Sequence, residues 1–403
     1  MRSHTTHEQD CFSELAAVQL EPLYTANLGR ALGASSAFGF ALAAFYLLPK
    51  FLIDELGAGA AEVGMITSAF GLATVVGAPF VGAWVDRVSR CRLIFAASVV
   101  MTGASLAFVL IDSLGPSVYV LRAVQGVCFA VVLTSVGALV ADLAPAERLS
   151  EALGLAGASM LIMSAVGPPI VEPLAAAAGW QPVFVLASVS AALGAVLVLA
   201  VREPTRSADG EGGAAASFAE MFGRRRIRHY AVITASVGAA FGVMFTFQAP
   251  FVSALGRAVI GGFFVAYSLV AIAVRIGCGG LADRLGRHRV AVFSLNVYTA
   301  VVLATATLQP AMLEITGALL GLAHGLFFPA FNGLVIGSTP ERERGKAFSV
   351  FTGSFYAGLA LGVIVFGFVA ESLGYPTVFV GTGAVTGLAG ALLVFSPEFR
   401  ADA

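Results

Sequence analysis

Charged side chains are scarce in this sequence. Asp, Glu, Lys and Arg make up 12% of its 403 residues, whereas a soluble domain carries about a quarter. Hydrophobic residues account for 58% of the chain, and the mean hydropathy is +0.89. This balance excludes an ordinary soluble domain and is typical of a membrane protein.

Several patterns that would indicate other functions are also missing. The formal net charge of -1 leaves no basic surplus for phosphate groups, which argues against a nucleic-acid partner. We find no nucleophile–base constellation, phosphate loop or metal-ligand spacing, and an enzyme would need one of these. The cysteines are too far apart to indicate a disulfide framework or a metal site; they are Cys11, Cys91, Cys128 and Cys278.

Residues 1–30 lack the basic-then-apolar order of a secretory signal, and they carry scattered acidic residues such as Glu8 and Glu14. We expect a cytoplasmic tail. Apolar stretches long enough to cross a bilayer as helices follow it. They predict twelve spans, at 32–53, 63–85, 93–112, 118–140, 152–176, 182–201, 229–252, 260–281, 290–308, 312–336, 347–370 and 378–395.

Basic residues predict which ends of these spans face the cytoplasm. With alternating spans, all but four of the 23 Lys and Arg fall on one side, the side of both termini. Because basic residues collect in cytoplasmic loops, both termini are expected inside. Lys50 and Arg257 would face outward, and Arg122 and Arg275 fall within predicted spans.

A flexible connector, rich in Gly, Ala, Ser and charge, runs from Glu203 to Ser217 and separates six spans from six. The expected organisation is a tail at 1–30, a six-helix bundle at 31–202, a cytoplasmic linker at 203–227, a second six-helix bundle at 228–396 and a short tail at 397–403.

The two halves repeat each other. Pro145 and Ala152 recur 195 residues later as Pro340 and Ala347. A longer match has a constant offset of 197. Two copies of a six-helix unit explain both offsets, and parallel repeats of this kind place a binding site between the halves and expose it to alternate sides by rocking. The longer match pairs Gly82, Asp86, Arg87, Arg90 and Arg92 with Gly279, Asp283, Arg284, Arg287 and Arg289.

With these residues in place, the chain resembles the major facilitator superfamily over nearly its whole length. The loop signature of that family, Gly-x-x-x-Asp-Arg-x-Gly-x-Arg-Arg or Lys, is met in the second half, where Gly286 supplies its central glycine. In the first half Ser89 replaces this glycine. The resemblance implies an all-α polytopic membrane protein with twelve transmembrane helices in two pseudo-symmetric bundles.

The same resemblance implies that the two matched loops form a cytoplasmic gate. Its aspartates, here Asp86 and Asp283, lie near the start of a helix in the opposite half, and its arginines pair with acidic neighbours. A carboxylate at a helix N-terminus gains about 0.3–1 kcal/mol. The alternative is that both loops are ordinary basic cytoplasmic loops.

Arg122, Gln125 and Gly126 match the Arg-x-x-Gln-Gly pattern in the fourth helix of the family, which is frequent in proton-coupled members. An arginine inside a span needs a partner or a water-filled cavity. Glu172 lies at a similar depth in the next span, so the sequence predicts an Arg122–Glu172 pair that opens on protonation. A static pair or a hydrated glutamate is the alternative.

Gly167 and Pro168, with Gly154 upstream, resemble the antiporter motif of the export branches. Met163 stands at one expected glycine, and Val171 and Glu172 replace the final glycine pair. The alternative is that glycine and proline merely kink a packed helix.

The candidate solute site is an aromatic wall with a few polar groups, as in many small-molecule pockets. It favours an amphiphilic or drug-like solute, although such phenylalanines also pack against lipid or neighbouring helices. Arg275 is a candidate for binding an anionic group; the alternative is that it pairs with a backbone carbonyl or with Asp283, two turns further along the same face. His324 is a candidate for a neutral hydrogen-bonding role. The candidate residues are Tyr46, Phe245, Gln248, Tyr267, Arg275, His324, Phe327, Phe328, Phe331, Asn332, Phe355 and Tyr356.

The sequence therefore predicts a proton-coupled exporter of the drug-antiporter type in a bacterial inner membrane. A proton symporter that imports an organic anion through Arg122 and Arg275 is the alternative, and a sensor or intramembrane enzyme is the least favoured class. The expected partners are the solute and the lipid bilayer, the expected state is a monomer, and no cofactor is expected beyond the proton as coupling ion.

Overall fold

The computed structural model describes residues 23–145, 148–204, 218–257, 259–277, 281–340, 343–396 and 399. Within these ranges the chain is helical and contains no strand. The predicted tails lie largely outside these ranges, as do residues 205–217 of the linker and Gly279.

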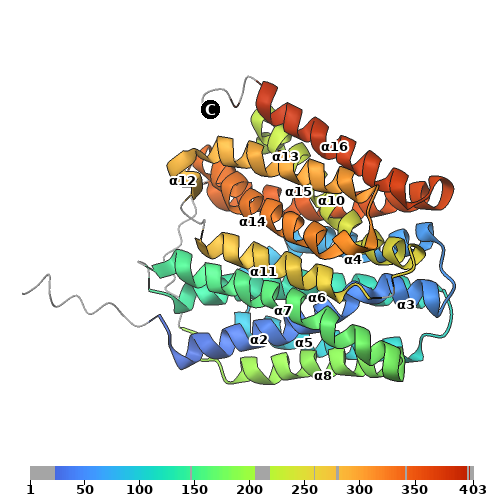
Figure 1. Cartoon of the computed structure of the whole chain (residues 1–403). Coiled ribbons are helices and arrows are strands. Elements are labelled where there is room, and N and C mark those ends of the chain that lie inside the picture. Colours follow the sequence, from blue (N-terminus) through green and yellow to red (C-terminus); the bar gives the residue numbers. More distant parts are fainter. Residues whose placement is uncertain are drawn as a thin grey trace, which may run out of the picture.

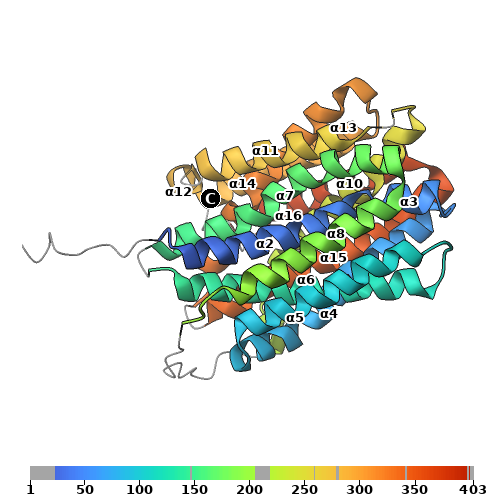
Figure 2. The same ribbon diagram turned by 90° about the horizontal axis from the view of Figure 1, so that it is seen from below.

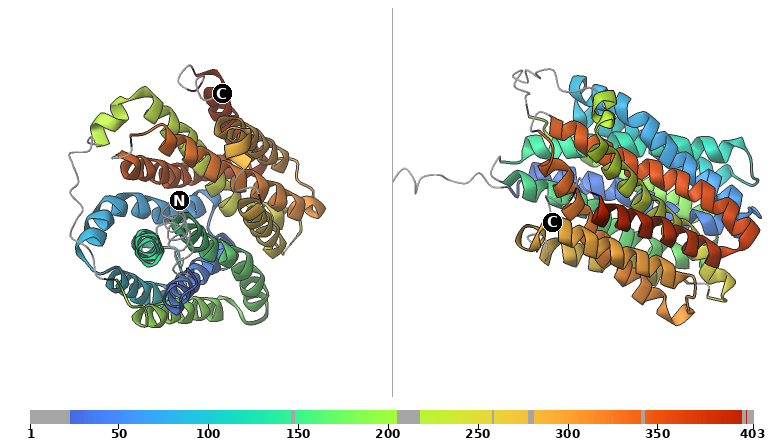
Figure 3. Two further views of the ribbon diagram at one scale, coloured as in Figure 1. Left: turned by 90° about the vertical axis from the view of Figure 1, so that its left-hand side faces the viewer. Right: turned by 90° about the horizontal axis from the view of Figure 1, so that it is seen from above.

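The helices form two groups that follow the two halves of the sequence. Helices of the first half lie below those of the second half in Figure 1, and the end-on view separates the same two groups (Figure 3, left). The first half contains α2 (Ala26–Ala44), α3 (Leu48–Asp54), α4 (Ala60–Arg87), α5 (Arg90–Ala107), α6 (Pro116–Leu143), α7 (Leu149–Ala178) and α8 (Trp180–Leu199). The second half contains α9 (Phe218–Gly223), α10 (Arg225–Ala254), α11 (Gly261–Gly277), α12 (Leu281–Leu285), α13 (Arg287–Thr305), α14 (Leu313–Gly337), α15 (Arg344–Leu373) and α16 (Tyr375–Phe395).

The predicted all-helical membrane fold is confirmed. Eleven helical segments of the described chain are long and apolar enough to cross a bilayer. The span predicted at 260–281 corresponds to α11, a shorter apolar helix. Helix α2 begins and helix α16 ends at the same end of the bundle (Figures 1 and 2), which we call the termini end. The opposite end, where α3 ends and α11 begins, is called the far end.

The first predicted span differs from the structure in its start and its shape. Thr25 caps α2, because its hydroxyl accepts a hydrogen bond from the Leu28 amide at 3.1 Å. The helix therefore begins at Ala26, inside the predicted tail. A 3-10 turn at Phe45–Leu47 then separates α2 from α3, and Pro49 lies in the first turn of α3. Proline lacks the amide hydrogen that a continuous helix would use there, so the span breaks at this point.

The most extensive contacts between the halves are those of α4 with α15 and of α7 with α11, and α10 also contacts α3 and α4. Gly64 of α4 packs so closely that a Cβ there would lie 2.5 Å from the Val363 carbonyl oxygen. Gly71 likewise approaches Ala360, and Gly367 faces Gly64. These small residues allow the two backbones to approach, as in other membrane helices. Gly82, by contrast, has open space around it.

Candidate functional site

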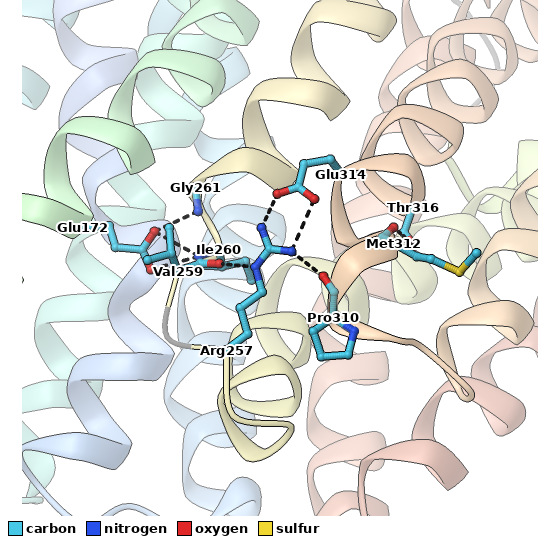
Figure 4. Close-up of polar contacts among 9 residues, drawn as sticks. All are labelled: Glu172, Arg257, Val259, Ile260, Gly261, Pro310, Met312, Glu314 and Thr316. Atoms are coloured by element: carbon cyan, nitrogen blue, oxygen red, sulfur yellow. Dashed lines mark hydrogen bonds and ion pairs between the residues drawn. The ribbon is translucent and has the colours of Figure 1, made fainter.

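A buried carboxylate connects the two halves at the far end of the bundle. Glu172 of α7 is 6% exposed. It accepts hydrogen bonds from the Ile260 amide at 3.0 Å and from the Gly261 amide at 2.8 Å, where α11 begins (Figure 4). A helix N-terminus presents free amides and a partial positive charge, so it stabilises an anion. We call this contact the Glu172 bridge.

Lys50 of α3 completes the surroundings of the carboxylate, with its Nζ 3.4 Å from Glu172 Oε1. Both residues line a hollow of about 280 Å³ together with Asp54 and Glu55. The hollow lies at the far end and borders the Glu172 carboxylate.

The segment that leads into α11 is fixed within the second half by Arg257 (Figure 4). Its guanidinium binds the carboxylate of Glu314 on α14 and the carbonyl oxygen of Pro310. Its Nε donates to the Val259 carbonyl at 3.1 Å. Glu172 therefore binds a segment that is anchored to the second half, so the bridge links the two halves rather than α7 and a loosely held loop.

The predicted Arg122–Glu172 pair is wrong for this conformation. Arg122 of α6 donates instead to Gln125 Oε1 at 2.6 Å, and its guanidinium lies over the rings of Phe70 and Phe45 at 4.9 and 5.7 Å. Similar depth on neighbouring helices suggested the pair, but the carboxylate is already occupied by two backbone amides and Lys50. These backbone donors carry no residue-type signal in the sequence.

A second carboxylate also makes a contact between the halves at the far end, and this contact was not predicted from the sequence. Glu371 of α15 accepts a hydrogen bond from the Ala61 amide at the start of α4, at 2.9 Å. Glu371 is exposed, whereas Glu172 is buried. The repeat could have indicated this contact, because α7 and α15 correspond to each other and each has a glutamate near its far end.

The repeat register shows how the two contacts differ. At the 195-residue offset, Gly367 of α15 corresponds to Glu172 of α7. At the 197-residue offset, Gly64 corresponds to Gly261. In one helix pair, therefore, two glycines meet directly, and in the other a carboxylate occupies the glycine position. Glu371 lies one turn nearer the helix end than Gly367, which explains its exposure.

Other residues predicted for proton coupling have packing roles that bring helices together. A Cβ at Gly126 would overlap the Phe70 carbonyl group, so α4 and α6 meet there. A Cβ at Gly167 would lie 2.6 Å from Ala43 Cβ, so α2 and α7 meet there. Pro168 lies inside α7 with Pro169 and Pro173, and prolines at such positions interrupt the helical hydrogen bonds.

The predicted gate lies at the termini end. In the first loop, Arg90 pairs with Asp142 at 2.8 Å and lies 3.8 Å from Glu203, both in its own half. Arg87 and Arg92 are exposed. The side chains of Asp86 and Asp283 lie outside the described residues, so their predicted contacts remain a prediction.

Ser89 has a structural role that explains why it replaces the expected glycine. Its hydroxyl accepts from the Arg92 amide at 3.3 Å and caps α5, and it donates to Glu203. Burial raises the pKa of Glu203. Hydrogen bonds from Ser89 and from the Arg90 and Cys91 amides, together with the Arg90 charge, lower it by more, so the pKa lies below its usual range.

In the second copy of the loop, Gly286 precedes α13 at a φ of +92°, a conformation that favours glycine. Arg287 donates to the Gly333 carbonyl at 3.2 Å, again within its own half. Arg284 and Arg289 are exposed.

The candidate solute residues gather in a ring cluster that crosses between the halves. Tyr46, in the 3-10 turn between α2 and α3, lies 5.4 Å from Phe245 and 5.7 Å from Phe264, measured between ring centroids. Phe129 of α6 lies 5.5 Å from Tyr356 of α15. The predicted aromatic wall is therefore a contact surface shared by both halves.

Within the second half, the rings surround His324. Its ring lies 5.0 Å from Phe241, 5.9 Å from Phe328, 6.0 Å from Phe355 and 6.1 Å from Tyr267. Phe327 and Phe331 stack on each other and are fully buried, so they belong to the core. Several buried polar atoms of this region have no hydrogen-bond partner among the described residues: Gln248 Oε1 and Nε2, Arg275 Nε, His324 Nδ1 and Asn332 Oδ1.

Comparison with known proteins identifies the family. The family model described as Major Facilitator Superfamily matches residues 31–311 and 247–402. The "Multi-drug resistance efflux pump PmrA" of Streptococcus pneumoniae is 26% identical, over 83% of this chain and 86% of its own. The "Staphylopine export protein" of Staphylococcus aureus is 23% identical, over 82% and 85%.

Solved structures agree in fold. A peptide transporter POT superposes with a TM-score of 0.77 at 13% identity, covering 92% of this chain and 94% of its own. A D-xylose–proton symporter superposes with a TM-score of 0.76 at 14% identity, covering 93% and 98%.

Proposed function

The chain belongs to the Major Facilitator Superfamily, and from this premise we propose that it exports a small amphiphilic organic solute in exchange for protons. It is a multi-pass membrane protein and a secondary transporter. The proposed setting is a bacterial inner membrane, with both termini in the cytoplasm and the far end outside. The proposed working unit is a monomer without a cofactor, and the proton is the coupling ion.

Export is supported by the relatives, which are named as an efflux pump and an export protein. The observation that carries proton coupling is the Glu172 bridge. This carboxylate is buried, crosses between the halves and borders a hollow at the far end. A group in that position can take up a proton from outside and change the contact between the halves.

The chemistry of the bridge gives the direction of the coupling. The ionised carboxylate forms charge-assisted hydrogen bonds with the α11 amides, and such bonds are roughly twice as strong as neutral ones. Protonation removes the charge, the attraction to the helix N-terminus and the attraction to Lys50. The far end is therefore closed while Glu172 is ionised and opens when it is protonated. An opened far end releases the solute outward, and the proton leaves to the cytoplasm later in the cycle.

The test is Glu172→Gln in proteoliposomes with an imposed proton gradient. Glutamine resembles the protonated acid and cannot titrate, so solute transport driven by the gradient should fall at least about tenfold, the effect of about 1.4 kcal/mol. Exchange of solute against solute, which needs no proton, should continue in the same vesicles.

Glu371→Gln is the matched control. Glu371 makes the same kind of contact between the halves but is exposed, so gradient-driven transport should remain within about twofold of wild type, an effect below roughly 0.5 kcal/mol. Full gradient-driven transport by Glu172→Gln contradicts the proposed coupling. Reconstitution in both orientations, followed by solute uptake or release, distinguishes export from import.

A further inference from the structure

Arg275 on α11 has no counter-ion in the described structure. Its Nε is buried without a hydrogen-bond partner, and it forms no ion pair with a described residue. Its guanidinium lies over the ring of Phe328 at 5.5 Å. A charged group inside a membrane bundle is costly unless it is paired or hydrated, so such a residue normally indicates a functional site.

Other polar groups beside Arg275 are also unsatisfied. His324, Phe328 and Asn332 follow one another at intervals of four residues, so they share one face of α14. His324 is 6% exposed, yet its Nδ1 has no partner, and neither has Asn332 Oδ1. Buried polar groups in folded proteins nearly always have partners. The set of Arg275, His324, Phe328 and Asn332, here called the α11–α14 cluster, therefore presents polar atoms that are available to a ligand.

The charge of a ligand that fits this cluster follows from the distribution of acidic residues. Every Asp and Glu in the described helices lies within about two turns of a helix end. Glu172, the deepest described one in α7, is occupied by the α11 amides and Lys50. Arg122 also lacks a carboxylate partner and binds the neutral Gln125. The described interior thus contains two guanidinium groups, one in each half, without compensating carboxylates.

We propose, on the premise of the exporter function above, that the transported solute is an amphiphilic organic anion whose acidic group binds Arg275 in the α11–α14 cluster. The guanidinium supplies charge-assisted hydrogen bonds that carboxylate and sulfonate groups match well. The neighbouring rings of Phe328 and Phe355 provide an apolar surface for the rest of the solute. An amphiphilic cation should bind more weakly, because the guanidinium groups of Arg122 and Arg275 repel it.

The test uses two dyes with the same xanthene core and opposite charge, fluorescein as the anion and rhodamine 123 as the cation. Fluorescence anisotropy reports their binding to the full chain in nanodiscs. Fluorescein should bind at least about tenfold more tightly than rhodamine 123, the effect expected from one hydrogen-bonded charge. This comparison is made on the wild-type chain, so it does not depend on a variant that folds.

Variants then assign the charge preference to Arg275. Arg275→Gln should weaken fluorescein binding about tenfold or more, and Arg275→Lys, which keeps the charge, should retain part of it. Arg202→Gln is the control, because Arg202 is exposed beyond the end of α8, and it should bind like wild type. Elution on size exclusion establishes that each variant is folded.

The binding and transport measurements test the anion preference and the exporter function separately. Tighter binding of rhodamine 123, no binding of fluorescein, or unchanged fluorescein binding by Arg275→Gln overturns the inference. If rhodamine 123 is transported in proteoliposomes and fluorescein is not, the exporter function stands and the anion preference falls. If fluorescein binds through Arg275 but is not moved in either direction, the site stands and the exporter function fails.

Discussion

Glu172 shows what sequence reasoning can and cannot reach at the scale of one residue. Its position inside a predicted span marks it as functional, because an intramembrane carboxylate is costly. Its partners were mispredicted, since they are backbone amides of α11 that carry no residue-type signal. The distance between these amides and Glu172 depends on how the two halves pack against each other. Ser89 is a similar case, because its capping role became evident only from the local backbone.

Glu203 gives a pH-dependent prediction at this scale. Its pKa is lowered in the folded chain, so its contribution to stability is present above its ordinary pKa near 4.5 and is lost as pH falls through the lowered value. Glu203→Gln should reduce the free energy of unfolding at pH 7 by about 1 kcal/mol, the scale of a partly hydrated charged hydrogen bond.

Thermal unfolding in detergent at pH 7 and at pH 3.5 measures this effect. The difference between variant and wild type should shrink at the lower pH. A difference of equal size at both values contradicts the assigned role of Glu203 as an ionised acceptor.

At the scale of elements, hydropathy alone predicted the existence and order of the spans, because the bilayer fixes how long an apolar helix must be. It did not predict the break at Phe45–Leu47 or the early start of α2, which depend on Pro49 and on the Thr25 cap. It also did not predict which helices meet: Gly64 and Gly367 join α4 to α15, whereas Gly358 and Gly362 face α10.

Gly358 provides a test of close helix packing. A Cβ at this position would overlap the Ala235 carbonyl group of α10, so Gly358→Ala must push α10 and α15 apart. We expect a loss of about 1–3 kcal/mol in the free energy of unfolding. Gly103 of α5 has open space around it, and Gly103→Ala should be neutral or stabilising by up to about 1 kcal/mol, because alanine favours helix.

Thermal unfolding of the two variants in the same detergent compares these effects directly. If Gly358→Ala is as stable as Gly103→Ala, the close contact between α10 and α15 is not needed for the fold.

At the scale of the whole molecule, the repeat offsets predicted two like halves, and the two helix groups of Figure 3 follow that division. The sequence could not predict which contacts join the halves, because such contacts depend on their relative orientation. The aromatic wall illustrates this limit. Tyr46, Phe245 and Tyr356 were predicted from composition and helix order. The pairing of Tyr46 with Phe245 across the halves, and that of Tyr356 with Phe129, which was not predicted, required the structure.

The two carboxylate contacts at the far end lie on helices that correspond in the repeat. Glu371 lies one helical turn nearer its helix end than Glu172 does, so Glu371 is exposed and Glu172 is buried. In the proposed mechanism, only the buried contact responds to protonation. The account predicts that the halves rock as units about their shared interface and that Glu172 controls the far end of that movement.

Paired spin labels measure this movement most directly, in a chain whose four cysteines are replaced by alanine. One pair, Ser113 and Leu255, spans the halves at the far end, and the other, Leu149 and Leu285, spans them at the termini end; all four positions are exposed. We predict that Glu172→Gln lengthens the far-end distance and shortens the termini-end distance. Unchanged distances in both pairs, or a far-end change without the opposite change at the termini end, would contradict a rocking movement controlled by Glu172.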